Sequence, residues 1–97
     1  MYSVKRLEIV IDRSYLNRLL KELENCGIEG YTVLDQVRGK GERGLRESDA
    51  LADIFTNAYI LVACSEETAE KAVAAIRPLL KMSGGMCLLS DAQWVRH

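Results

Sequence analysis

Glycines and long cations alternate between residues 38 and 46, and this segment is the part of the chain best suited to bind an anion. Its cations are Arg38, Lys40, Arg43 and Arg46, and three glycines separate them. Guanidinium and ammonium groups donate charge-assisted hydrogen bonds to phosphate and carboxylate oxygens. The glycines let a ligand approach the backbone closely. The pattern therefore predicts an anion-binding loop, with a solvated hairpin as the alternative from these residues alone.

Two glycine-rich turns follow predicted elements, and each could present backbone N–H groups to a phosphate. Gly39 and Gly41 follow a strand, whereas Gly84 and Gly85 follow a helix. Lys81 and the loop cations would then neutralise the bound anion. Neither turn is a Walker motif. A helix stop followed by a turn is an equally good interpretation of the second one.

Residues that carry catalytic or metal-binding chemistry are sparse in this chain. His97 is the one histidine and stands at the last position, so it supports no Ser-His-Asp or Cys-His arrangement. The three cysteines, Cys26, Cys64 and Cys87, lack CxxC spacing, and we interpret them as buried thiols rather than metal ligands. Two methionines close to Cys87 leave soft-metal binding as an alternative. We predict no catalytic residue and no metal ligand.

Composition indicates a single small domain that spans residues 1–97. The 13 basic and 14 acidic residues give a net charge of −1, so no overall field favours nucleic acid as a partner. The N-terminal residues lack the apolar run of a signal peptide, and no apolar run is long enough to span a membrane. Three widely spaced cysteines fit a reducing compartment, so we expect a cytoplasmic protein.

Apolar periodicity predicts four strands and two helices. Residues 4–12, 30–37, 59–64 and 86–89 have the pattern of strands. One helix is expected between an N-cap at Asp12 or Ser14 and a terminating Gly27, and a second one after the N-cap Ser65. Pro78 should kink or end this second helix, with a further turn through Leu79 and Leu80 as the alternative. The order strand-helix-strand, long loop, strand-helix-strand predicts an α+β, ferredoxin-like βαββαβ sandwich.

The strand predicted at residues 59–64 is apolar on both faces. An antiparallel sheet that is covered on one side only should alternate apolar and polar residues. A layer of helices accounts for one of the two apolar faces. A chain of this length has little left to cover the other face, so we infer a partner subunit.

These segments together resemble the PII signalling family, and most closely its PII-like branch linked to bicarbonate transport and carboxysomes. The matching motifs are Gly-Tyr-Thr-Val from residue 30, Gly-Lys-Gly-Glu-Arg-Gly from residue 39 and Gly-Gly-x-Cys-x-x-Ser-Asp-Ala from residue 84. Shorter matches lie at residues 4–9, 57–59 and 76–80, so the resemblance spans most of the chain in register. It implies a homotrimer with a long T-loop, here about residues 38–57.

The resemblance also implies adenine nucleotide binding in clefts between neighbouring subunits. It would place Thr32 near the adenine, with the two glycine turns lining the phosphates and Arg96 approaching from the tail. The implied nucleotide-binding residues are Thr32, Gly39, Lys40, Gly41, Arg43, Arg46, Gly84, Gly85 and Arg96. No cofactor is implied beyond these ligands, which would be AMP or ADP, with ATP and bicarbonate as further candidates.

Departures from the PII sequence pattern restrict the ligands and functions that the resemblance implies. Met86 stands where PII proteins carry a lysine after the phosphate-loop glycine, which favours AMP or ADP over tightly held ATP. The T-loop contains no tyrosine before Tyr59, so it has no acceptor for uridylylation. The glutamine that helps PII bind magnesium and 2-oxoglutarate has no match, so nitrogen sensing is not implied. The cysteine-pair extension of many bicarbonate-transport regulators is also missing, which favours the shorter, carboxysome-associated kind.

The leading hypothesis is thus a non-enzymatic sensor whose T-loop docks on a membrane bicarbonate transporter or a carboxysome-related protein. One alternative is an enzyme, either a slow nucleotide phosphohydrolase or an acylphosphatase-like one that would use Arg43 and Asn57. A trimeric metal-handling protein of similar fold is another alternative. RNA binding ranks last, because the predicted sheet lacks paired exposed aromatic residues for base stacking.

Overall fold

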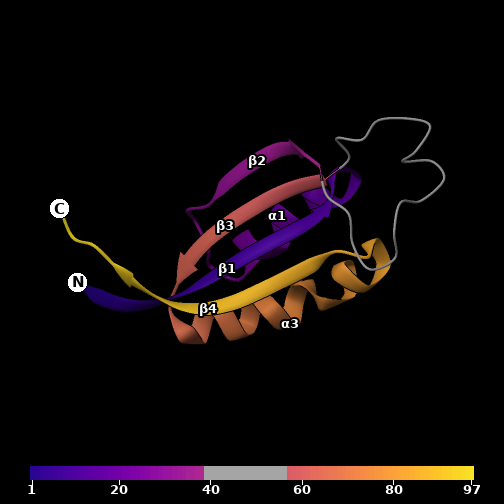
Figure 1. The fold of residues 1–97 in the computed structure, drawn as a ribbon. Helices are drawn as coiled ribbons and strands as arrows, with labels where there is room; N and C mark the ends of the chain where they lie inside the picture. The colour runs from indigo at the N-terminus through magenta and orange to yellow at the C-terminus, as the bar shows by residue number, and fades with distance from the viewer. Residues whose placement is uncertain (39–56) are drawn as a thin grey trace.

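The computed structural model describes residues 1–38 and 57–97. Its strands are β1 (Tyr2–Asp12), β2 (Thr32–Val37), β3 (Asn57–Cys64) and β4 (Met86–Trp94). Its helices are α1 (Leu16–Asn25) and α3 (Glu66–Ser83), and a short 3₁₀ turn, η1 (Arg13–Tyr15), precedes α1. Figure 1 shows these elements along the chain.

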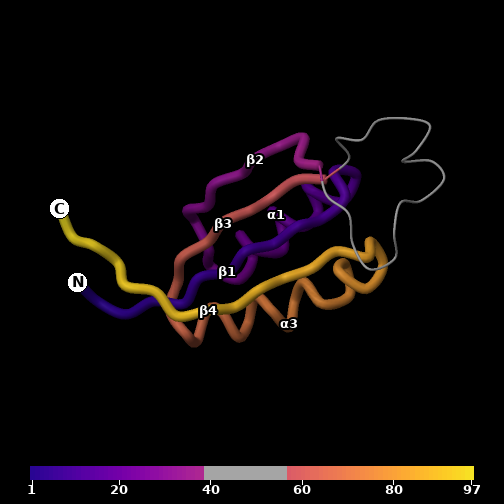
Figure 2. The backbone as a smooth tube through the Cα atoms, in the orientation of Figure 1, coloured from indigo at the N-terminus to yellow at the C-terminus, as the bar shows by residue number. Residues whose placement is uncertain are grey.

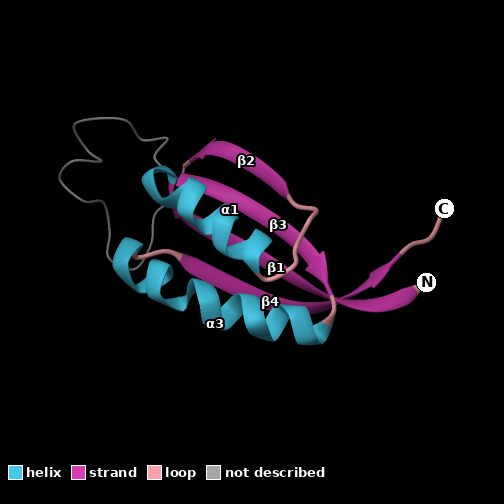
Figure 3. Cartoon of the chain, turned by 180° about the vertical axis from the view of Figure 1, so that it is seen from behind, coloured by secondary structure: helices cyan, strands magenta, loops and turns pink. Residues whose placement is uncertain are grey.

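The four strands form one antiparallel sheet in the order β2-β3-β1-β4. β1 is a central strand and pairs with both β3 and β4. The two helices lie side by side on one face of this sheet (Figure 3). The arrangement confirms the predicted ferredoxin-like α+β fold.

The hydrophobic core lies between the sheet and the helices, and alternate strand residues supply half of it. The fully buried leucines and isoleucines are Leu7, Ile9, Ile11, Leu19, Leu23, Ile60 and Ile76. Burying one such side chain contributes roughly 1.5–3 kcal/mol relative to leaving it exposed. Ala58 and Val62 of β3 are also buried on this side, which confirms that a helix layer covers one apolar face of that strand.

The opposite face of the sheet has no cover from any described part of the chain. Leu61 lies between the buried Ile60 and Val62 and is 36% exposed, as the alternation of strand side chains requires. The helices pack on the other side only (Figure 3). The inference that a second molecule covers this face therefore stays a proposal, but the uncovered apolar face that motivated it is present.

Helix α1 follows the predicted pattern closely. Leu19 and Leu23 are buried in the core, one turn apart on the same stripe. Gly27 has φ +93°, the left-handed conformation that commonly ends a helix, and it carries no side chain to strain it. The N–H of Ile28 then donates to the carbonyl of Leu23 at 3.1 Å, which closes the helix end.

Helix α3 continues through Pro78 to Ser83. Its start is as expected: Ser65 caps it by accepting a hydrogen bond from the N–H of Thr68 at 3.2 Å. Pro78 does not end the helix; the alternative in which Leu79 and Leu80 continue it is the one observed. Leu79 is buried just after the proline, so the last turn packs on the sheet, and this packing offsets the hydrogen bond that a proline cannot donate.

Strand β4 extends beyond the prediction, which ended it at residue 89 and left a tail from residue 90. It continues to Trp94 and pairs with β1 as far as Tyr2. Side-chain contacts across this extension explain why it is a strand: Lys5 pairs with Asp91, and the Tyr2 and Trp94 rings stack with centroids 6.4 Å apart. The two chain ends therefore lie next to each other (Figure 2).

Candidate functional site

The Gly84-Gly85 turn caps helix α3. Gly84 has φ +73° and its N–H donates to the carbonyl of Leu80 at 2.9 Å. The N–H of Gly85 donates to the same carbonyl at 3.1 Å and to Oγ of Ser83 at 3.2 Å. Both amides thus have acceptors within the chain, as a helix stop requires. In this conformation, neither glycine offers a free N–H donor to a ligand.

Gly85 also packs tightly against the end of β1. A Cβ atom at this position would lie 2.7 Å from the backbone oxygen of Val10 and 3.2 Å from a methyl carbon of Leu80. Glycine is therefore the residue that allows the turn to rest on β1. This contact fixes the turn at the end of the sheet where β1 and α3 both finish (Figure 1).

The two ends of the T-loop meet at the same end of the sheet as this turn. Val37, the last residue of β2, pairs with Asn57, the first residue of β3, and Asn57 in turn pairs with Asp12 of β1. The predicted residues Gly39, Lys40, Gly41, Arg43 and Arg46 lie between these ends, outside the described part of the chain. Asn57, the residue considered for acylphosphatase-like chemistry, is a strand residue at this loop root.

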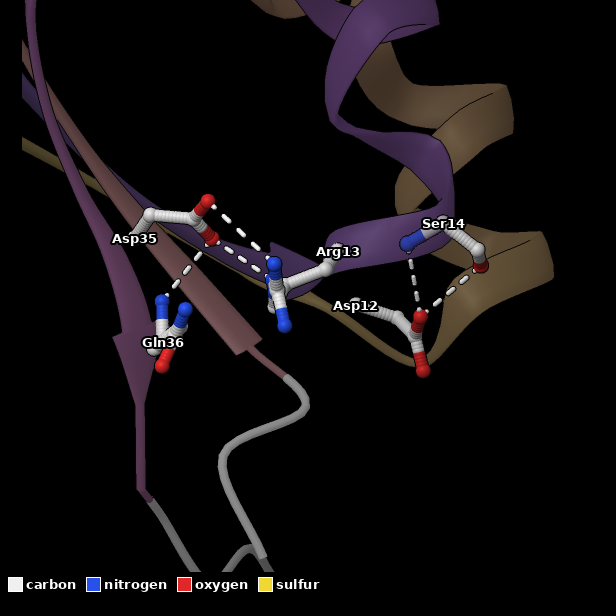
Figure 4. A network of polar contacts seen from close by, with 5 residues as sticks. All are labelled: Asp12, Arg13, Ser14, Asp35 and Gln36. Atoms are coloured by element: carbon white, nitrogen blue, oxygen red, sulfur yellow. Dashed lines mark hydrogen bonds and ion pairs between the residues drawn. The ribbon is translucent and has the colours of Figure 1, made fainter. Parts of the chain in front are cut away.

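A polar network holds the root of the loop, and the sequence patterns did not reveal it (Figure 4). Arg13 of η1 binds Asp35 of β2 through Nε at 2.7 Å and a terminal nitrogen at 3.4 Å. Asp35 also accepts a hydrogen bond from the N–H of Gln36 at 2.8 Å. Next to it, Asp12 caps η1 by accepting from the N–H and hydroxyl of Ser14, at 2.9 and 2.8 Å.

This network lies at an irregularity in the pairing of β2 with β3. The pairing with β3 shifts register between Leu34 and Val37, and Gln36 has φ +60°, which is unfavourable for a residue other than glycine. The local bond between Asp35 and the Gln36 amide stabilises this conformation. The bulge turns the chain just before it enters the loop. A break in the alternation of residues 34–37 is the one sequence signal for it.

Thr32 and Arg96 lie far from the Gly84-Gly85 turn within one chain. Thr32 is the first residue of β2, exposed, and about 16 Å along the strand from Val37 at the loop root. The Arg96 guanidinium lies over the Tyr2 ring, 5.1 Å from its centroid. Tyr2 and Val10 are eight residues apart on β1, so Arg96 is roughly 26 Å from the turn. One chain therefore does not bring all the predicted residues together.

The surroundings of several ionisable side chains raise their pKa values. The pKa of Lys5 is raised, first by its hydrogen bond to Asp91. The pKa of Tyr59 is raised by its hydrogen bond to Glu8, and burial raises the pKa of the Cys64 and Cys87 thiols. All three cysteines are unpaired thiols.

The described residues hold neither a metal-binding cluster nor a membrane-spanning helix. Across residues 1–38 and 57–97, no group of three or more His, Cys, Asp or Glu side chains has the geometry to hold a metal ion. Among the helices in these same ranges, none is long and apolar enough to cross a membrane.

Comparison with known proteins identifies the family. The model of the family described as "Nitrogen regulatory protein P-II" matches residues 4–97. The chain belongs to the P-II family. None of the curated proteins matches this P-II family chain.

Solved structures of PII-like proteins share the fold. CPII of Thiomonas intermedia K12, a nitrogen regulatory PII-like protein solved with ADP, AMP and bicarbonate, is 25% identical with a TM-score of 0.83. The match covers 98% of this chain and 91% of that one. The same protein solved with ADP and bicarbonate gives 26% identity and a TM-score of 0.82, with the same two coverages. A PII-like signaling protein of Thermus thermophilus is 24% identical, with a TM-score of 0.76, over 97% of this chain and 91% of that one.

Proposed function

We propose that this P-II family chain is a regulatory protein that binds AMP or ADP, and bicarbonate, in clefts between the copies of a homotrimer. The observation that carries the proposal is the likeness to CPII, which was solved with ADP, AMP and bicarbonate and matches nearly the whole chain. The distribution of the candidate residues supports it. Because Arg96 and the Gly84-Gly85 turn lie at opposite ends of β1, they can share one nucleotide only if different copies supply them.

The nucleotide would lie near the loop root, where the T-loop ends and the Gly84-Gly85 turn meet. In this proposal Thr32 contacts the adenine, while Gly39, Lys40, Gly41, Arg43 and Arg46 reach the phosphates from the T-loop. A cation beside phosphate oxygens forms charge-assisted hydrogen bonds, which are roughly twice as strong as neutral ones. Met86 supplies no such cation, so ADP should bind at least as tightly as ATP.

The regulatory output would pass through the T-loop to a membrane bicarbonate transporter or a carboxysome-related protein in the cytoplasm. A regulator of this kind needs the loop to differ between the free and the nucleotide-bound protein, because a ligand shifts an equilibrium only by its differential affinity for two states. The network of Arg13, Asp35 and Gln36 holds the root from which such a difference would start.

Isothermal titration calorimetry on the full chain tests the proposal directly. Titrations with AMP, ADP and ATP, each with and without bicarbonate, should show micromolar or tighter binding of AMP or ADP and a change in affinity when bicarbonate is added. Absence of heat and of any thermal stabilisation with all three nucleotides would contradict it. Phosphate release measured in the same samples distinguishes a regulator from the alternative, a slow nucleotide phosphohydrolase.

A further inference from the structure

The N-terminal and C-terminal ends of the chain form a two-stranded ribbon that extends beyond the rest of the sheet. β1 pairs with β3 only from Lys5 onward, whereas its pairing with β4 continues to Tyr2 and Trp94. β1 and β4 accordingly run past the end of β3 in Figure 3. The ion pair between Lys5 and Asp91 lies at the base of this ribbon, and the Tyr2 and Trp94 rings stack near its tip. Side-chain contacts therefore hold the ribbon at both of its ends.

Arg96 contacts this aromatic pair two residues after β4 ends. Its guanidinium carbon lies 5.1 Å from the centroid of the Tyr2 ring, which is within the roughly 6 Å of a cation–π interaction. Arg96 is exposed and has no hydrogen bond or ion pair with any residue of the ranges 1–38 and 57–97. The N–H donors of a guanidinium lie in its plane, so a ring over its face leaves them able to bind phosphate oxygens. Tyr2 thus holds the cation without occupying its donors.

We propose that Tyr2, supported by Trp94, is a positioning residue that orients Arg96 toward a phosphate group of the adenine nucleotide. This inference rests on the proposed function, in which Arg96 of one copy reaches a nucleotide held beside the Gly84-Gly85 turn of another copy. It assigns a role in ligand binding to the N-terminal end of β1, which lies at the far end of that strand from the turn. The phosphate contacts the arginine and not the tyrosine, so Tyr2 acts only through Arg96.

Orientation of Arg96 before the ligand binds matters because this residue belongs to the end of the chain. A free arginine side chain samples many rotamers, and a ligand that fixes one of them must offset the lost entropy. The contact with Tyr2 reduces the number of conformations in the free protein, so less entropy remains to be lost on binding. The stack with Trp94 restricts the Tyr2 ring in the same way. Adenosine has no phosphate, so this contribution should be limited to nucleotides.

Isothermal titration calorimetry on the full chain tests this role with ADP as the probe, and with adenosine, measured by competition with ADP, as the phosphate-free comparison. Tyr2→Leu should weaken ADP binding roughly two- to fivefold and leave the affinity for adenosine unchanged. Tyr2→Phe keeps an aromatic ring and should bind ADP within about twofold of the original protein. Arg96→Ala should weaken ADP binding at least roughly tenfold, and adding Tyr2→Leu to this variant should have no further effect.

Arg18→Ala is the matched control, because Arg18 on α1 also lies over an aromatic ring, 5.5 Å from the centroid of Tyr15. This variant should leave the affinities for ADP and adenosine unchanged. Light scattering checks that each variant has the assembly mass of the original protein. Where Tyr2→Leu does not, Trp94→Leu takes its place, and the same loss of affinity for ADP alone is expected.

Three outcomes would overturn the positioning role of Tyr2. Equal weakening of ADP and adenosine binding, or additive effects of Tyr2→Leu and Arg96→Ala, would show that Tyr2 acts on the structure and not through Arg96. Unchanged ADP affinity in Tyr2→Leu would contradict this role and leave the proposed function intact, because the original protein still binds ADP. Absence of ADP binding by the original protein would contradict both.

Discussion

The missing side chain at Gly85 determines how closely the turn after α3 approaches β1. A Cβ atom on residue 85 would lie only 2.7 Å from the backbone oxygen of Val10. A backbone atom of a central strand cannot move aside without a large cost in free energy. The same residue was proposed from the sequence to line a phosphate. Its packing role does not depend on any ligand, so the two roles can be separated by experiment.

Gly85→Ala should destabilise the fold, because the added methyl group overlaps the Val10 carbonyl. Overpacking of this kind typically costs ~1–3 kcal/mol of unfolding free energy, and the midpoint of urea unfolding should fall accordingly. Gly30→Ala is the matched control: no atom lies within 4 Å of its added Cβ and its φ is not positive. We expect this control to change stability by less than about 1 kcal/mol. Equal effects of the two substitutions would contradict the packing role of Gly85.

Arg43→Ala should weaken ADP binding if this residue contacts the phosphates as proposed. A hydrogen bond to a charged group is worth ~1.5–3 kcal/mol, so calorimetry should show an affinity at least roughly tenfold lower. Added salt should weaken binding to the original protein more than to the variant, because the contact is ionic. Arg77→Ala, an exposed arginine on α3, serves as the control. Unchanged ADP affinity in Arg43→Ala would contradict a contact between this arginine and the phosphates.

The hydrogen bond from Tyr59 to Glu8 predicts a dependence of stability on alkaline pH. The bond raises the pKa of Tyr59 in the folded protein above its ordinary value of 10.0. A raised folded pKa means that the contribution is complete below the unfolded pKa and is lost as pH rises through the folded value. Above pH 10, urea unfolding should therefore show a steeper loss of stability in the original protein than in Tyr59→Phe. Identical slopes would show that this bond contributes nothing in solution.

At the scale of elements, the packing of helix α3 on the sheet keeps the backbone helical at Pro78. Helix α3 contains Pro78 between Ile76 and Leu79, both of which are buried against the sheet. A proline inside a helix removes one hydrogen bond and costs ~3 kcal/mol relative to alanine. The helix nevertheless continues to Ser83, since ending it at the proline would expose Leu79.

Pro78→Ala should stabilise the protein, because alanine restores the backbone N–H while the exposed side-chain position loses little packing. We expect an increase in the free energy of unfolding of about 1–3 kcal/mol, measured by urea denaturation with unchanged helix content in circular dichroism. A decrease would show that the proline ring makes packing contacts that outweigh the lost hydrogen bond.

The sequence predicted the order and type of the four strands and two helices that the structure describes, but not the 3₁₀ turn η1. The apolar period of each strand and helix is set by its own residues. The prediction failed where a partner strand or helix decides the outcome. Residues 90–94 have no strong strand pattern of their own, and β4 reaches Trp94 because β1 pairs with it. The bond between Arg13 and Asp35, and the bulge at Gln36 beside it, likewise depend on residues that meet only after folding. The same limit applies to the candidate site, because within one chain Arg96 and Gly85 lie at opposite ends of β1.

For the whole molecule, the proposed homotrimer makes a direct prediction about mass. Light scattering at micromolar concentration should give three times the chain mass of 10.9 kDa. The reason is that one face of the sheet stays uncovered and apolar in the single chain, and burial of such a face drives association. A monomer across the whole concentration range would contradict the trimer and, with it, a nucleotide cleft between copies.

The central position of β1 has a consequence for the synthesis of the chain. β1 leaves the ribosome before the other described strands, yet its two neighbours, β3 and β4, begin only at residues 57 and 86. Its core residues therefore cannot be buried between paired strands until β3 and β4 have been synthesised. Contacts between distant parts of a sequence form slowly, and unpaired strand edges favour aggregation in the meantime. Ribosome-bound chains that end before residue 86 should accordingly remain sensitive to protease, and protection should appear only when β4 has emerged.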